Sequence, residues 1–190
     1  MRRRQKSTKQ SAKNTMPGQS ANPSSRQTDL DLAVQHHAAG RLPEAERIYR
    51  RIVQADPGQP VALHLLGVIA HQMGNSEKSI ELISKALAIK PGYADAHGNL
   101  AIVFKDLGRL KEAAASHRAA LAITPDAADV HNNLSNALRG MGRLDEAVAS
   151  YREALAMSPQ SADMHNNLGL AFHGQGRLDE AAARYRAALT

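Results

Sequence analysis

The sequence predicts an all-α protein, a solenoid of five tandem helix-turn-helix units that follows a disordered basic tail. Prolines and glycines recur with a period of 34 residues, at Pro57, Pro91, Pro125 and Pro159, and at Gly40, Gly74, Gly108, Gly142 and Gly176. A fixed period of this length indicates stacked supersecondary units rather than one globular core. Aromatic residues make up only 3% of the chain, so the core must be built from Ala, Leu, Ile and Val, which suits closely packed helices.

Residues 1–25 form the predicted tail, which is rich in Gln, Ser, Asn and Lys. It contains almost nothing apolar to bury, so we expect it to be disordered. Residues 1–27 hold seven basic residues and no acidic one, which leaves 17 basic and 18 acidic residues in the rest of the chain. The net charge of +6 therefore comes from the tail, and the rest of the chain is almost neutral. We interpret the tail as a solvated segment with no specific nucleic-acid partner, although a basic run can also contact nucleic acid or anionic lipid. A start at Met16 would remove six of the seven tail charges.

Five units are expected at residues 26–59, 60–93, 94–127, 128–161 and 162–190, the last one incomplete. A position within a unit is called a place and is counted from the first residue of that unit. In the third unit, apolar residues at helical spacing predict a first helix, with Ala96, Leu100, Val103, Phe104 and Leu107 on its buried face. Gly108 supplies the left-handed residue that ends this helix. A second stripe predicts the second helix, with Leu110, Ala113, Ala114, His117, Ala120 and Leu121. Glu112 lies in the first turn of that helix, where the helix dipole favours an anion, and Pro125 ends it.

The period and phrases such as GRLDEAVASYREALAMSP resemble the tetratricopeptide repeat family, from Arg26 to the end of the chain. The resemblance implies a right-handed α-solenoid whose first helices line a concave groove. It also implies a scaffold that binds an extended peptide or a partner protein in that groove. The stretch YADAHGNLAIVFKDLG and the two HNNL phrases are similar to the arm of protein O-linked N-acetylglucosamine transferases, in which sixth-place asparagines hold substrate peptides. Unit two has Leu65 and unit one has Asp31 at that place, so the row is interrupted toward the N-terminus.

Polar residues recur at four places of the first helix and form the predicted peptide-binding groove. Places two and six are four residues apart and therefore share one face of a helix. An Asn amide offers both a donor and an acceptor, so a regular row of them matches the alternating C=O and N–H groups of an extended peptide. Solvation of the helix surface and hydrogen bonding between units are the alternative explanations. The predicted groove residues are Asn99, Asn133 and Asn167 at place six, Asp95, Asp129 and Asp163 at place two, Asn132 and Asn166 at place five, and Lys105 and Arg139 at place twelve.

The recurring histidines predict packing rather than chemistry. His97, His131 and His165 occupy the fourth place of three units. Neighbouring first helices lie about 10 Å apart, whereas metal ligands lie about 2 Å from one ion, so these side chains cannot share a zinc. The chain has no cysteine, and no base accompanies a candidate nucleophile. We therefore expect no metal, no cofactor and no catalytic residue, and we expect a cytoplasmic location.

Two further classes of site are excluded by residue type. A clamp for acidic C-termini uses lysines at places two and five, but place two is Asp in three units and would repel a carboxylate. The Gly140-Met-Gly142 and Gly174-Gln-Gly176 segments follow a helix rather than a strand, so they are interpreted as helix ends and not as phosphate loops. The apolar runs are also far shorter than the roughly 20 residues that a membrane span requires.

The last unit stops at Thr190 without a polar capping helix, and Leu178, Tyr185 and Leu189 would form a face suited to stacking. We expect either that a longer protein continues beyond this residue or that the end pairs with a partner. Three functions remain open. The first is a scaffold for peptides or partner proteins. The second is the substrate-recruiting arm of a longer glycosyltransferase or sulfotransferase. The third is a structural module that associates end to end.

Overall fold

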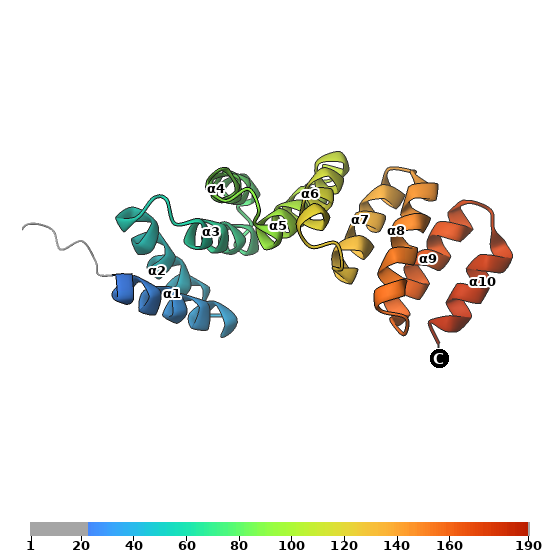
Figure 1. Cartoon of the computed structure of the whole chain (residues 1–190), viewed down its shortest axis with the longest axis horizontal. Coiled ribbons are helices and arrows are strands. Elements are labelled where there is room, and N and C mark those ends of the chain that lie inside the picture. Colours follow the sequence, from blue (N-terminus) through green and yellow to red (C-terminus); the bar gives the residue numbers. More distant parts are fainter. Residues whose placement is uncertain (1–22, 190) are drawn as a thin grey trace, which may run out of the picture.

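The computed structural model describes residues 23–189, which form ten α-helices in five antiparallel pairs. The pairs follow one another in line along the molecule, from α1 and α2 at one end to α9 and α10 at the other (Figure 1). The predicted all-α solenoid of five helix pairs is therefore confirmed. The helices are α1 Pro23–Ala38, α2 Leu42–Ala55, α3 Pro60–Gln72, α4 Ser76–Ile89, α5 Ala94–Asp106, α6 Leu110–Ile123, α7 Ala128–Gly140, α8 Leu144–Met157, α9 Ala162–Gly174 and α10 Leu178–Ala187.

Helix α1 begins at Pro23, so the last three residues of the predicted tail, 23–25, are helical rather than disordered. Proline is well suited to the start of a helix because its missing N–H would have no partner there. The rest of the predicted tail lies outside the described residues.

The turn within each pair follows the same design. The recurring glycine after each first helix adopts a positive φ, which is +71° at Gly108. This left-handed conformation is accessible to glycine without a Cβ clash, and it reverses the chain into the second helix, as predicted. The predicted Glu112 lies in the first turn of α6 and is bonded to the Arg109 guanidinium, which lowers the pKa of this carboxyl. The same Arg–Glu pairing recurs in α8 and α10.

The core runs through the array as two overlapping clusters rather than as one centre. One cluster joins buried residues between Ala33 and Ala86, and the other joins those between Ile83 and Ala181. Helix α4 contributes to both clusters, because Leu82 faces one and Ile83 the other. Each pair therefore depends on its neighbours for burial, as expected for stacked repeats.

Small side chains set the distance between the helices of a pair. The residue in the second helix that faces the first is buried in every pair: Ala45, Ser79, Ala113, Ala147 and Ala181. One predicted core position is wrong. Leu107 is 39% exposed because α5 ends at Asp106 and Leu107 already belongs to the turn.

Candidate functional site

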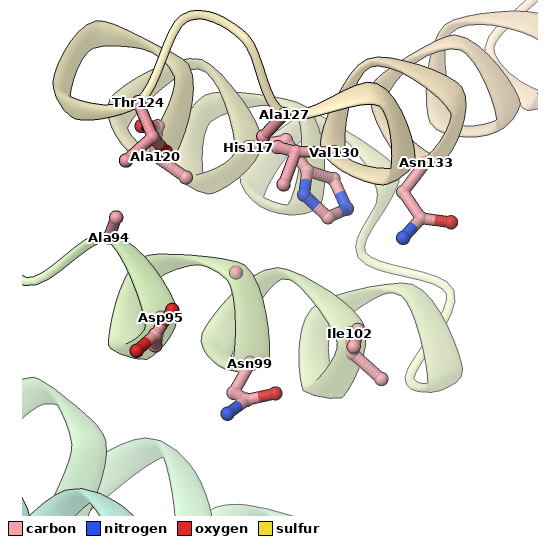
Figure 2. Close-up of a pocket in the computed structure, with 11 residues that line it drawn as sticks. Ala94, Asp95, Asn99, Ile102, His117, Ala120, Thr124, Ala127, Val130 and Asn133 are labelled. Atoms are coloured by element: carbon pink, nitrogen blue, oxygen red, sulfur yellow. The ribbon is translucent and has the colours of Figure 1, made fainter. Parts of the chain in front are cut away.

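A cavity of about 500 Å³ lies between the first helices α5 and α7, with α6 behind it. Three of the predicted groove residues line this cavity, namely Asp95, Asn99 and Asn133 (Figure 2). Most of its wall consists of small or apolar side chains. The complete lining is Ala94, Asp95, Gly98, Asn99, Ile102, His117, Ala120, Thr124, Ala127, Val130 and Asn133.

The sixth-place asparagines differ in what they contact. The Asn99 Nδ2 atom lies 2.8 Å from Nε2 of His64, and Nδ2 of Asn167 donates to Oδ1 of Asn132 at 3.2 Å. In both cases the partner is the fifth-place residue of the preceding unit. Bonding between units, one of the alternatives to a free peptide ladder, thus occurs at these two positions. One amide N–H and the carbonyl oxygen of each asparagine remain for other partners.

Asn133 has no such partner, because the fifth place of the preceding unit is Gly98. Figure 2 shows the Asn133 side chain pointing from α7 toward α5, whereas Asn99 points to the other side of α5. The cavity therefore lies where unit three meets unit four. At this junction the fifth place is a glycine, so no side chain is present to bond the next asparagine.

The buried His64 connects two neighbouring units through a partly buried chain of hydrogen bonds. Its Nδ1 lies 3.0 Å from the Tyr93 hydroxyl, and its Nε2 is the atom that contacts the Asn99 amide. Because the amide N–H donates to Nε2, Nδ1 carries the proton of the neutral ring and donates to the hydroxyl. Burial lowers the pKa of His64 to about 4, although the nearby Asp95 carboxylate opposes this shift. The roles of His64 and Tyr93 as supports of the groove were not predicted from the sequence.

The remaining groove residues are spread along the array. Asp129, Asp163 and Asn166 are exposed. Lys105 is exposed, and its ammonium lies 3.4 Å from the Asp106 carboxylate. Arg139 is half-buried and lies close to Tyr151. Burial raises the pKa of the Tyr151 phenol, and the Arg139 guanidinium partly opposes this shift. The two twelfth-place cations therefore have different surroundings.

The fourth-place histidines hold the loops between units. In each of three units, Nε2 of the histidine lies 2.9 Å from the carbonyl oxygen of the recurring proline that precedes it. An imidazole N–H can donate to this carbonyl, which lies in the loop just after the preceding helix. The contact ties the loop to the first helix that follows it. The pairs are His97 with Pro91, His131 with Pro125 and His165 with Pro159.

Three family models match the chain, and each describes a tetratricopeptide repeat. One matches residues 58–126 and 92–160, and the others match residues 132–190 and 26–69. The chain belongs to the tetratricopeptide repeat family. Its helix pairs and their glycine-ended turns are the repeats of this family. None of the curated proteins compared with the chain matches it.

Solved structures of other tetratricopeptide repeat proteins share this fold. A crystal structure of MamA is 25% identical, covers 83% of this chain and 92% of its own, and has a TM-score of 0.77. MamA of Desulfovibrio magneticus RS-1 is 18% identical, with coverages of 90% and 94% and a TM-score of 0.80. YrrB, described as a TPR protein with an unusual peptide-binding site, is 19% identical, with coverages of 85% and 83% and a TM-score of 0.75.

Residues 23–189 of this tetratricopeptide repeat protein contain neither of two other features, a metal site and a membrane-spanning helix. No group of three or more His, Asp or Glu side chains in that range could hold a metal ion. None of the helices in the same range has the length and hydrophobicity that crossing a membrane requires.

Proposed function

We propose that this tetratricopeptide repeat protein is an interaction scaffold that binds an extended segment of a partner protein along its first helices. The observation that carries the proposal is that Asp95, Asn99 and Asn133, from two successive units, all line one cavity of about 500 Å³. Family membership supports it, as does the peptide-binding site ascribed to YrrB, which has the same fold.

The chemistry of the site suits recognition of a peptide main chain. Asn133 presents a complete amide, and Asn99 retains its carbonyl oxygen and one N–H after bonding to His64. Such groups can bond the N–H and C=O groups of an extended segment whatever its side chains are. The apolar wall, which includes Ile102 and Val130, would then accept one side chain of the ligand.

Selection from a library of random heptapeptides displayed on phage tests this proposal, followed by fluorescence anisotropy on the selected peptides. We expect the double variant Asp95→Ala/Asn133→Ala to bind them about tenfold more weakly, since each lost hydrogen bond contributes roughly 0.5–1.5 kcal/mol. The control is Asp126→Ala/Asp179→Ala, which removes two exposed polar side chains that lie on no first helix and outside the cavity. Equal binding by both double variants and the unchanged protein would refute the proposal.

A second candidate is the substrate-recruiting arm of a longer glycosyltransferase or sulfotransferase. It is supported by the place-six asparagines Asn99 and Asn133 in the cavity wall, because the resemblance to the O-linked N-acetylglucosamine transferase arm rests on this row. Reading the gene beyond the codon for Thr190 tests it, since a stop codon there would exclude this candidate. A cytoplasmic location belongs to both proposals, and the absence of cysteine is compatible with a reducing compartment.

End-to-end association is a third candidate, supported by apolar exposure on the last helix pair. Leu178 is 60% exposed and Leu189 is 88% exposed. The equivalent Leu144 is covered by the next unit, where a Cβ added at Gly174 would lie 3.2 Å from its Cδ1 atom. Light scattering across a concentration series tests this idea, and a strictly monomeric protein would contradict it.

A further inference from the structure

The hydrogen bonds between first helices follow a repeating rule that is broken at one junction. A fifth-place side chain bonds to the sixth-place asparagine of the next unit, 35 residues further on, as His64 does with Asn99 and Asn132 with Asn167. At the junction between α5 and α7 the fifth place is Gly98, and Asn133 lacks this partner. A Cβ added to Gly98 would meet nothing within 4 Å, so the missing side chain leaves open space.

The second helix behind this gap is also exceptional. The twenty-fourth place of a unit is Tyr49, Tyr151 or Tyr185 in three units and the apolar Ile83 in unit two, whereas α6 carries the titratable His117. His117 is only 1% exposed, and its Nδ1 atom has no hydrogen-bond partner among the described residues. An unpaired buried polar atom costs roughly 1–3 kcal/mol. Figure 2 shows the imidazole projecting into the space between α6, α7 and α5.

The gap contains little charge. Asp95 is the only charged residue of the cavity lining. Burial lowers the pKa of His117 to about 4, and the nearby Lys105 charge contributes in the same direction. The imidazole is therefore neutral at pH 7. The Lys105 ammonium lies 3.4 Å from the Asp106 carboxylate, so Asp95 is the charge left at the cavity, and it disfavours an acidic ligand side chain.

We propose that the gap above Gly98 is a subsite for a carboxamide side chain, glutamine or asparagine, supplied by the peptide that the groove binds. The ligand amide takes the position of the missing fifth-place side chain, pairs with the Asn133 amide and extends toward His117. The partner thus completes the hydrogen-bond row that the chain itself leaves incomplete. This inference rests on the proposed function, because it names the side chain that the peptide groove selects.

The dimensions and the lining agree with this ligand. The cavity is larger than one side chain, so it also accommodates the adjoining peptide backbone. Ala94, Ala120 and Ala127 supply small apolar surfaces for the methylene groups of the ligand. A carboxamide has both a donor and an acceptor, so it complements another amide, whereas a carboxylate or an ammonium group offers only one of the two.

The test uses the full chain and a panel of acetylated, amidated heptapeptides with the sequence Ser-Thr-Val-X-Val-Thr-Ser. Position X is Gln, Asn, Leu, Glu or Lys, so that Gln and Glu differ in charge and Asn and Leu have similar shapes. Affinities come from NMR titration, and the ring nitrogens of His117 are followed in the same spectra. We expect Gln or Asn to bind about fivefold to tenfold more tightly than the other three, which corresponds to one or two net hydrogen bonds. We also expect the His117 ring signals to shift.

Two variants at one position separate the subsite from the rest of the groove. Gly98→Asn restores the fifth-place side chain, which would bond Asn133 as Asn132 bonds Asn167, and it should abolish the preference for Gln and Asn. Gly98→Ala adds only a Cβ into open space and should retain the preference. Unfolding curves of both variants check that the fold is intact.

Each outcome bears on a different claim. If all five peptides bind equally, or if Gly98→Asn keeps the preference, the subsite proposal is wrong while the peptide-binding function stands. A preference for Glu or Lys would also overturn the subsite. If no peptide binds at all, the subsite fails, and if the phage selection also yields no ligand, the proposed function fails with it.

Discussion

Two glycines inside first helices should respond in opposite ways to the same substitution with alanine. At Gly67 an added Cβ would lie 2.7 Å from Cγ1 of Ile83 and 3.2 Å from the backbone oxygen of Ser79. It would also lie 3.3 Å from the backbone nitrogen of Ile83, so relief requires α3 and α4 to move apart. At Gly98 an added Cβ would meet nothing within 4 Å.

The expected magnitudes follow from these distances. Overpacking a well-packed core costs about 1–3 kcal/mol, and replacing a helical glycine by alanine recovers up to about 1 kcal/mol of helix propensity. Gly67→Ala should therefore lower the free energy of unfolding by up to about 2 kcal/mol. Gly98→Ala should raise it by roughly 0.5–1 kcal/mol, because only the propensity gain remains. Gly169 is an intermediate case, since its added Cβ would meet the movable ring of Tyr185 at 2.5 Å.

Urea unfolding followed by circular dichroism measures the three variants under one set of conditions. The expected order of stability is Gly98→Ala above the unchanged protein, with Gly67→Ala lowest. If Gly67→Ala were as stable as Gly98→Ala, the close approach of the α3 and α4 backbones would not limit the stability of this pair, and the packing argument would fail.

Three further predictions concern polar groups of the array. Burial lowers the pKa of His64 and of His117 to about 4, so the unfolded chain binds protons at these sites more readily than the folded one between about pH 6.5 and 4. Stability should therefore fall as the pH drops through this window, by up to about 3 kcal/mol for each histidine, as measured by urea unfolding. Asn99→Ala should destabilise the chain by about 1–3 kcal/mol, because it leaves His64 Nε2 without its partner, whereas Asn133→Ala should change thermal stability little. His131→Ala should cost about 1 kcal/mol and accelerate amide hydrogen exchange in the preceding loop, because it removes the bond to the proline carbonyl.

Each of these three predictions has a control or an outcome that would contradict it. Replacing both buried histidines with glutamine should flatten the pH dependence, and a profile that remains steep would assign it to other groups. Equal stability of Asn99→Ala and Asn133→Ala would show that the bond to His64 contributes nothing net. For His131→Ala, unchanged exchange in that loop would contradict the proposed role of the fourth-place histidines.

The helix pairs could be predicted from the sequence because their signals are local. A glycine that must adopt a positive φ, such as Gly108, marks a turn wherever it stands, and apolar residues at helical spacing mark the buried face between two turns. The failure at Leu107 has a local cause as well, since the helical stripe was continued one residue past the point at which the chain leaves α5.

The contacts of the groove could be predicted only in part. Spacing put Asp95, Asn99 and Asn133 on one face of the first helices, the resemblance to the tetratricopeptide repeat family put that face in the groove, and all three residues line the cavity. Spacing did not show that the Asn99 amide is already bonded, because its partner His64 lies 35 residues earlier on another helix. The same offset recurs between Asn132 and Asn167, so a search for complementary side chains 35 residues apart could have found the pairing.

The sequence by itself determined the number and order of the helix pairs, because the glycines that recur every 34 residues end each first helix through local backbone conformation. The tertiary structure decided which polar groups of neighbouring units pair and which are left open. That choice depends on how closely the backbones of two stacked helices approach, a distance set by side chains on both of them. The missing side chain at Gly98 becomes a cavity, and the His117 imidazole becomes an unpaired group beside it, only when α5, α6 and α7 are packed together.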